Sequence, residues 1–313
     1  MRRGQLTGAL GRLLLCVGTV ILLFVAYQLW GTGIAESHSQ AVLRTQFDHE
    51  LHRADRATGS TTTTTIPGGN PDPAPTTAQP AEGQPVGLLQ IPRIGVDKVI
   101  VEGTSTTDLR QGPGHYGIAG QGPVTPLPGQ AGNVGIAGHR TTYGAPFYNL
   151  NELAPGDPIV ITTTQGVFTY KVTSSLTVSP SDVSVMAAST TPELTLTTCT
   201  PRFSASNRLV VHATLASSRL TASAATTTPP TTPTGRHAGG AQADGLAGGQ
   251  GDWVPALWWG GAVVVAALVV WSVARRRSGR PTRALLYGVG GAGVLVALFF
   301  FFGAVSPLLP ASF

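Results

Sequence analysis

The chain has little charge and almost no cysteine. Charged residues make up 11% of its 313 residues, and cysteine occurs twice, as Cys16 and Cys199. Cys16 lies in an apolar run near the N-terminus, so we do not expect the two thiols to pair, and a disulfide framework is excluded. Cys199 ends the threonine-rich stretch LTLTTC. It is therefore either a small buried residue or a nucleophile.

Lysine is equally scarce, and the net charge of +5 comes from arginines that flank apolar runs. Those arginines are Arg2, Arg3, Arg12, Arg275, Arg276, Arg277, Arg280 and Arg283. Without these eight, the chain holds 12 basic and 15 acidic residues. The basic balance therefore indicates membrane topology and argues against nucleic-acid binding.

Three apolar runs, residues 13–30, 254–273 and 284–305, are each about as long as a bilayer-spanning helix. A cleaved signal peptide is the alternative for the first run. No convincing cleavage site follows Trp30, so an uncleaved anchor is favoured. The three runs therefore predict a multi-pass protein of the cell membrane, which has membrane lipid as a partner.

The arginine clusters also predict the orientation of these spans. Because arginines beside spans stay on the cytoplasmic side, residues 1–12 and the loop 274–283 are expected inside the cell. The large segment between the first two spans and the tail 306–313 are then extracellular.

Two low-complexity segments delimit one folded extracellular domain. Residues 59–85 are rich in Thr and Pro, and residues 221–252 are similar, so both are expected to be solvated linkers. The segment between them, residues 86–220, is about as long as a typical single domain. Within residues 36–56, Leu43, Phe47 and Leu51 have helical spacing. A simple stalk is nevertheless the favoured interpretation, so that 31–85 is predicted to be a stalk and linker.

The domain is predicted to be mostly β. Short runs of β-branched residues bounded by Gly, Pro or Asp predict strands, and such a pattern with little helix is typical of a sandwich or a small closed barrel. The predicted strands are 86–91, 97–103, 133–138, 158–164, 167–178, 194–199 and 208–215. Short helical turns are predicted at 106–111, 149–153 and 179–188.

Strand alternation separates Cys199 from the core. Leu194, Leu196 and Thr198 share one face of their strand, so Cys199 lies on the other. In the last strand, the leucine-bearing face is opposite Arg208 and His212. We therefore expect Cys199 and Arg208 to point out of the core into a groove.

A cysteine nucleophile needs a base, because the thiolate is the attacking form. The domain offers His115, His139 and His212, and His139 directly follows a predicted strand and a glycine. His212 is its geometric rival, since it shares a face with Arg208. A metal site at His139 and Cys199 is a weak alternative, because no further soft ligands occur at zinc spacing.

The stretches TLTTC (195–199) and AGHR (137–140), with Arg208 nine residues after the cysteine, resemble the sortase family of Gram-positive bacteria. The longer phrases GHRTTYGAPF and TCTPRFS look most like class E sortases of actinobacteria. The resemblance runs over residues 86–216. It implies a sortase-type closed β-barrel with short helices, flanked here by transmembrane helices.

The resemblance also implies a transpeptidase without a cofactor. Cys199 would cleave an LPxTG- or LAxTG-like sorting signal of a secreted protein between Thr and Gly through a thioacyl intermediate. His139 would act as general acid and base, and Arg208 would hold the oxyanion or the signal backbone. An amine of the cell-wall precursor (lipid II or a peptidoglycan peptide) would then accept the acyl group.

Four more residues are expected to bind the sorting signal, namely Tyr143, Pro146, Phe147 and Thr198. The three that follow His139 are equally well explained by packing of the turn in which they lie.

Three alternatives remain from the sequence. The enzyme could polymerise pilins, with a pilin lysine as the acceptor, or the domain could be a non-catalytic, sortase-like membrane scaffold. A cysteine L,D-transpeptidase is a poor match, since it expects His-Gly before the cysteine and the chain has Thr197 and Thr198 there.

Overall fold

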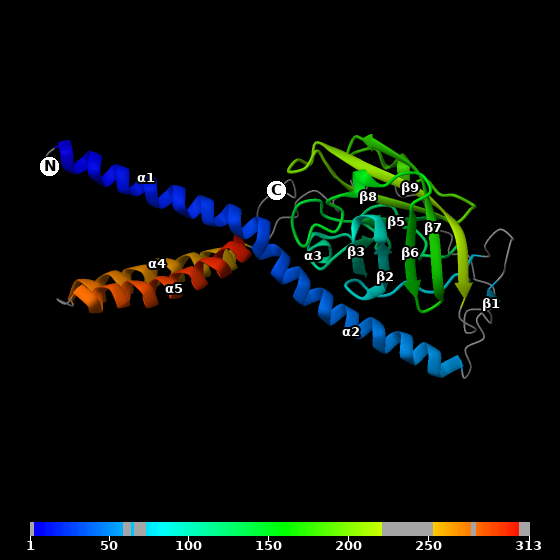
Figure 1. The fold of residues 1–313 in the computed structure, drawn as a ribbon, viewed down its shortest axis with the longest axis horizontal. Coiled ribbons are helices and arrows are strands. Elements are labelled where there is room, and N and C mark those ends of the chain that lie inside the picture. Colours follow the sequence, from blue (N-terminus) through cyan, green and yellow to red (C-terminus); the bar gives the residue numbers. More distant parts are fainter. Residues whose placement is uncertain (1–2, 59–63, 66–72, 221–252, 277–279, 307–313) are drawn as a thin grey trace. The chain divides into compact units, whose positions relative to one another are not determined.

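The computed structural model describes residues 3–58, 64–65, 73–220, 253–276 and 280–306 (Figure 1). These residues form two compact units, one built from the terminal apolar helices and one that contains the β-sheet. The predicted linker 221–252 and almost all of the tail 306–313 lie outside the described residues.

The sheet unit is a closed, mostly β barrel. Its strands are ordered β1-β9-β7-β6-β2-β3-β4-β5-β8, and β8 also pairs with β9, so that all strands except the short edge strand β1 form a ring. The bounds are β1 Thr64–Thr65, β2 Pro85–Ile91, β3 Val96–Glu102, β4 Gly114–His115, β5 Asn133–Ala137, β6 Pro158–Thr163, β7 Gly166–Val178, β8 Glu193–Thr200 and β9 Asn207–Leu220.

All seven predicted strands are confirmed within a few residues at their ends. The strands β1 and β4 were not predicted, because two residues are too few to show alternation. The predicted helical turns correspond to α3 (Thr106–Leu109) and to two 3₁₀ turns, η3 (Leu150–Glu152) and η4 (Val183–Met186). Ser105 caps α3 through a reciprocal capping box with Asp108.

The barrel interior is filled by the apolar faces that strand alternation predicted. Leu194 and Leu196 of β8 are fully buried there, and so is Val211 of β9. Each such side chain contributes about 1.5–3 kcal/mol by leaving water. Because the leucine-bearing faces of β8 and β9 pack into this core, the opposite faces of the two strands can carry a functional site.

The interpretation of residues 36–56 as a simple stalk is wrong. They belong to the helix α2 (Thr32–Thr58), which runs along the barrel beside β2 and β3 (Figure 1). Leu43 and Phe47 are 3% and 2% exposed, and Leu43 packs on Val99 and Val101 of β3. The apolar positions at helical spacing therefore mark a docked helix.

The linker prediction for 59–85 is also wrong for its described C-terminal part. Ala74 is buried and bridges to Gln130, and the carbonyl oxygen of Pro75 accepts hydrogen bonds from Gln130 and Gln165. Side chains of the barrel thus supply the hydrogen bonds that a Pro-rich segment cannot make internally.

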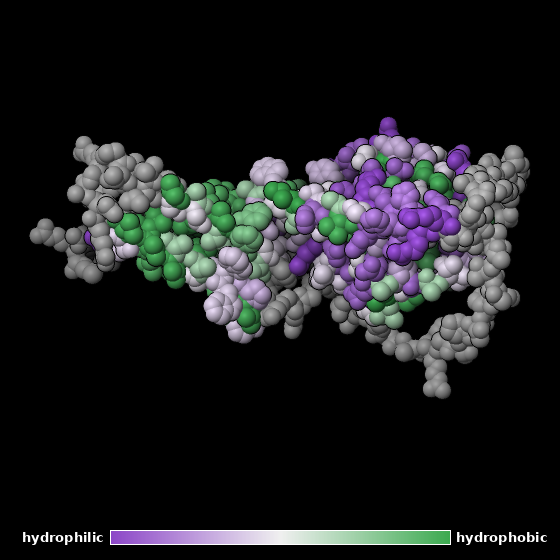
Figure 2. Space-filling model, turned by 90° about the horizontal axis from the view of Figure 1, so that it is seen from below, coloured by the Kyte–Doolittle hydropathy of each residue, from purple (hydrophilic) through white to green (hydrophobic). Residues whose placement is uncertain are grey.

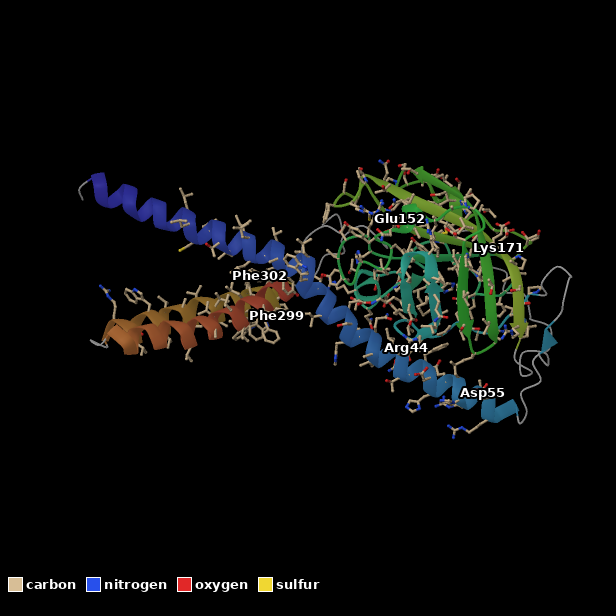
Figure 3. All side chains as sticks on the ribbon, viewed as in Figure 1. Arg44, Asp55, Glu152, Lys171, Phe299 and Phe302 are labelled. Carbon is tan, nitrogen blue, oxygen red and sulfur yellow. The ribbon has the colours of Figure 1, made fainter. Side chains whose placement is uncertain are left out.

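The other unit contains α1 (Arg3–Ala26), the π-helical turn η1 (Tyr27–Gly31), α4 (Val254–Arg276) and α5 (Arg280–Val305). Edge-to-face aromatic pairs join the N-terminal helix to α5, namely Phe24 with Phe302 and Tyr27 with Phe299, each at 5.1 Å between ring centroids (Figure 3). The apolar helices contrast with the hydrophilic surface of the barrel (Figure 2).

By length and composition, two helical stretches, Leu14–Arg56 and Val254–Val273, contain a window apolar enough to span a membrane. A shorter apolar helix, Val289–Val305, covers most of the third predicted span, whose side chains are described only from residue 289.

Candidate active site

A parallel ladder brings His139 next to Cys199. The strands β5 and β8 pair in parallel with Ala137 opposite Thr197. The backbone N–H of Gly138 donates to the Thr197 carbonyl at 3.1 Å, and the Thr198 hydroxyl donates to the Gly138 carbonyl at 2.7 Å. His139 and Cys199 each lie two residues beyond the last pair, so both emerge at the same edge of the barrel.

An antiparallel ladder brings Arg208 to the same place. The strands β8 and β9 pair with Cys199 directly opposite Arg208, and directly paired residues of an antiparallel ladder share a face. The expected grouping of Cys199 with Arg208 is therefore confirmed. Arg208 is half-buried, and its guanidinium donates to the carbonyl oxygens of Ala205 and Asn207 at the start of β9.

A groove lies along this face of β8 and β9, towards the segment that contains η4. Its wall is mainly apolar, with one cationic group, one carboxylate and the hydroxyls of a tyrosine and a threonine. It is lined by Tyr116, Pro123, Val178, Pro180, Asp182, Val183, Val185, Met186, Thr197, Arg208 and Val210. Arg208 is one of the lining residues, so the groove reaches the face of β9 that lies opposite Cys199.

His139 is nearly buried, with 8% of its surface exposed. Tyr143 lies against its ring at 5.1 Å between centroids, and the Arg110 guanidinium sits over the Tyr143 ring at 5.7 Å. Burial, reinforced by the charge of Arg110, lowers the pKa of His139 to about 4. The imidazole is therefore neutral at neutral pH and able to accept a proton.

Cys199 is 8% exposed, so the prediction of an outward side is right but the thiol is covered. Burial raises its pKa, while the positive charges of Arg208 and Arg140 act in the opposite direction. In this state the thiol keeps its proton. The two cations are placed to favour the thiolate once a neighbouring base takes that proton.

Arg140 is a site residue that sequence reasoning left without a role. It is buried, and its guanidinium donates to the Cys199 carbonyl at 3.2 Å and to the Thr200 hydroxyl at 2.7 Å. A third hydrogen bond, to Asn151 at 2.8 Å, holds the group in place. Its position directly after His139 in the sequence was the only available signal.

Tyr116 and Arg110 were also missed. Tyr116 is buried in the groove, with its hydroxyl 3.5 Å from that of Thr197, and its pKa is raised by burial. Neither residue carries a motif that separates it from ordinary loop residues in the sequence.

The other two histidines are not near the thiol. His115 is fully buried, with one ring nitrogen 2.9 Å from a Glu102 carboxylate oxygen and the other 2.9 Å from the Pro126 carbonyl oxygen. His212 pairs with Thr195 in the ladder, four residues along β8 from Cys199, which corresponds to about 13 Å along a strand.

Three of the four residues that were expected to bind substrate are buried and pack against other parts of the barrel. Phe147 is fully buried in the barrel core, Pro146 is buried, and the buried Thr198 hydroxyl is used by the Gly138 carbonyl. Pro146 and Phe147 are covered because the turn after His139 packs inward, and Thr198 is covered because β8 turns it towards the Gly138 carbonyl. Tyr143 is half-buried beside His139, so part of its side chain reaches the surface.

In the described part of the chain, no three His, Cys, Asp or Glu side chains lie close enough together to hold a metal ion.

Comparison with known proteins identifies one family. A family model described as the sortase domain matches residues 89–216. Sortase SrtE1 of Streptomyces coelicolor is 39% identical over 215 residues, which cover 65% of this chain and 55% of the relative. The chain thus spans about half the length of this relative. Sortase SrtE2 of the same organism is 30% identical over 218 residues, covering 66% of this chain and 81% of the relative.

Among solved structures, the crystal structure of sortase E1 from Streptomyces coelicolor with a tripeptide in the active site is 39% identical. The match covers 44% of this chain and 91% of the chain in that crystal structure, with a TM-score of 0.41. The sequence relatives, one of which is matched over four-fifths of its length, carry the assignment. With its closed β-barrel and its cysteine, histidine and arginine at one edge, the chain belongs to the sortase family and is class E-like.

Proposed function

We propose that this protein is a membrane-anchored sortase whose Cys199, His139 and Arg208 cleave a C-terminal sorting signal of the LPxTG or LAxTG type and transfer the protein to a cell-wall amine. The observation that supports this most strongly is the meeting of two ladders at one barrel edge. The β5–β8 ladder brings His139 to Cys199, and the β8–β9 ladder brings Arg208 to the same residue.

The reaction begins from a neutral thiol and a neutral imidazole. His139 takes the proton of Cys199, and the resulting thiolate attacks the carbonyl carbon of the signal threonine. Arg208 donates hydrogen bonds to the oxygen that becomes negative, because its guanidinium is a permanent cation with a fixed fork of donors. The burial that lowers the pKa of His139 makes its imidazolium a strong acid for the next step.

The peptide bond then breaks as His139 returns its proton to the leaving glycine amine. The acyl group is left on Cys199 as a thioester. An acceptor amine attacks this thioester and the sulfur leaves as the thiolate. His139 takes the surplus proton of the amine and returns it to the Cys199 sulfur, which restores the neutral thiol and the neutral imidazole. Atoms and charge balance without a cofactor, because one imidazole serves both proton transfers.

The terminal helices give the proposed location. With the arginine clusters inside the cell, the barrel lies outside, where secreted proteins and cell-wall precursors meet it. A reporter fused after Leu220 is expected to be active outside the cell, and one placed at Gly279 inside.

The test uses the full chain in detergent with a fluorogenic peptide containing LAETG. We expect cleavage between Thr and Gly and a mass increase on Cys199 equal to the acyl fragment, which hydroxylamine or an added amine discharges. Cys199→Ala is the control. A folded chain that neither cleaves this peptide or its LPETG counterpart nor acquires the acyl mass would identify a non-catalytic scaffold.

A further inference from the structure

The N-terminal helix α2 contacts both segments that cover His139. The first segment is the turn that carries Tyr143, whose ring lies against the imidazole. The second is the end of α3, where Arg110 places its guanidinium over the same Tyr143 ring. A helix from outside the predicted catalytic domain thus contacts the cover of the proposed acid–base.

Glu36 of α2 makes the first contact. It is 1% exposed and lies directly against Gly144, where a Cβ atom would collide with the carboxylate. Lys98 of β3 holds the same carboxylate, with its ammonium nitrogen 2.7 and 3.0 Å from the two oxygens. Burial raises the pKa of Glu36, and Lys98 counteracts this. The carboxylate of this pair is buried, while the Lys98 side chain is 25% exposed, so both oxygens are held from one side by the ammonium group.

The turn that Glu36 contacts has two non-glycine residues in the left-handed backbone region. Tyr143 has φ of 50° and Ala145 of 43°, values that non-glycine residues adopt only when their surroundings hold them there. The Glu36 carboxylate fills the space over Gly144, between these two residues. It therefore helps to hold the conformation that places Tyr143 on His139.

Gln40, one helical turn further along α2, makes the second contact. Its amide nitrogen donates to the Gln111 carbonyl at 2.8 Å, next to Arg110. The same side chain pairs with both backbone groups of Val99, at 2.7 and 3.0 Å. Gln40 thus ties the end of α3 to β3.

From these contacts we infer that α2 is a positioning element of the catalytic centre, in which Glu36 and Gln40 hold the Tyr143 and Arg110 cover in place over His139. The inference rests on the proposed role of His139. The ion pair between Arg44 of α2 and Asp97 of β3 offers a matched control, because it is exposed, its atoms lie 3.2 Å apart, and Arg44 follows Glu36 by about two helical turns (Arg44 is labelled in Figure 3).

The first experiment does not depend on activity. In full chain carrying Cys199→Ala, the rate at which diethylpyrocarbonate modifies His139 is followed by mass spectrometry. Adding Glu36→Ala is expected to raise that rate about fivefold or more by opening the cover, whereas adding Arg44→Ala leaves it unchanged. Buried His115 serves as the internal reference. Equal rates for His139 in the two variants would overturn the inference.

The second experiment measures peptide cleavage with Cys199 intact. Glu36→Ala is expected to lower kcat about tenfold with KM nearly unchanged, because a misplaced acid–base affects chemistry more than binding. The acid limb of the pH profile should also move upwards as the imidazole regains water. Tyr143 lies against His139 and the charge of Arg110 acts on it, and neither of these groups is altered. Glu36→Gln, which keeps the volume and an acceptor for Lys98, should restore most of the rate.

A Glu36→Ala profile that matches Arg44→Ala, or a Gln variant as slow as the Ala variant, would contradict positioning by contact. If the unmutated chain cleaves no signal peptide, the proposed function fails. The modification rates would still decide whether α2 holds the cover.

Discussion

Two buried histidines of the barrel, His139 and His115, show how burial alone does not define function. Both lie near strand ends, and both are less than one-tenth exposed. The ring of His115 has an oxygen at 2.9 Å from each nitrogen. In the part of the chain that the structure describes, neither ring nitrogen of His139 is hydrogen-bonded, and its ring neighbour is Tyr143.

The difference separates a structural histidine from a reactive one. An imidazole with both nitrogens engaged joins β4 to β3 and to the loop at Pro126, and it cannot exchange protons with a substrate without breaking the core. An imidazole whose nitrogens are unpaired, beside a thiol, can accept and return a proton. Mutations at the two positions should therefore affect different quantities.

The largest effects are expected at the reactive pair. Cys199→Ala should abolish cleavage, and His139→Ala should lower kcat/KM by about 10²–10⁴, because both proton transfers pass through one imidazole. Melting temperatures should change little in both variants. Steady-state peptide cleavage and thermal unfolding check this, with His212→Ala as the control that keeps most activity. A dead His212→Ala beside an active His139→Ala would reverse the assignment of the base.

His115→Ala should instead lose stability. It removes one partner of a fully buried pair and leaves Glu102, one of whose oxygens already lacks a hydrogen bond, without its histidine. Breaking such a pair costs about 3–5 kcal/mol of unfolding free energy. Denaturant unfolding of the full chain in detergent measures this, and the activity of the fraction that remains folded should be near normal. Unchanged stability with lost cleavage would erase the contrast with His139.

Arg208→Lys tests the third group of the site. An ammonium cannot reproduce the planar fork of donors, so the rate should fall about 10²-fold, as for loss of an oxyanion donor. The unfolding temperature should be little affected, because Arg208 is half-buried and its guanidinium donates to the carbonyl oxygens of Ala205 and Asn207, which are close to it in the chain. Single-turnover acylation separates this loss from a defect in peptide binding.

The pH profile of kcat/KM gives the finest distinction. Below a pH of about 4, His139 and Cys199 both hold protons and no thiolate forms. Above the pKa of Cys199, which burial raises beyond its ordinary value of 9.0, neither group holds a proton for the leaving amine. Activity should therefore be maximal between these limits and fall on both sides. An acid limb near the ordinary imidazole value would contradict the covered His139.

Local patterns were enough to predict much of the fold. Alternating residues between turn formers identified every strand of more than two residues, and the same alternation put Cys199 and Arg208 on one face of β8 and β9. The resemblance of TLTTC and AGHR identified the family from a few residues. These features depend on neighbours in the chain, so a single sequence contains them.

Long-range packing decided the rest. The parallel pairing of β5 with β8 joins residues about sixty positions apart, and no local pattern states that these two strands are neighbours. The same packing turned Phe147 and Thr198 inward, so that neither side chain is exposed. It also docked α2 on the barrel, where Glu36 contacts Lys98 and Gly144. Both residues are distant from Glu36 in the sequence. Periodicity shows which face of an element is apolar. Which element packs against that face depends on the tertiary structure of the closed barrel, and so does the cover over His139.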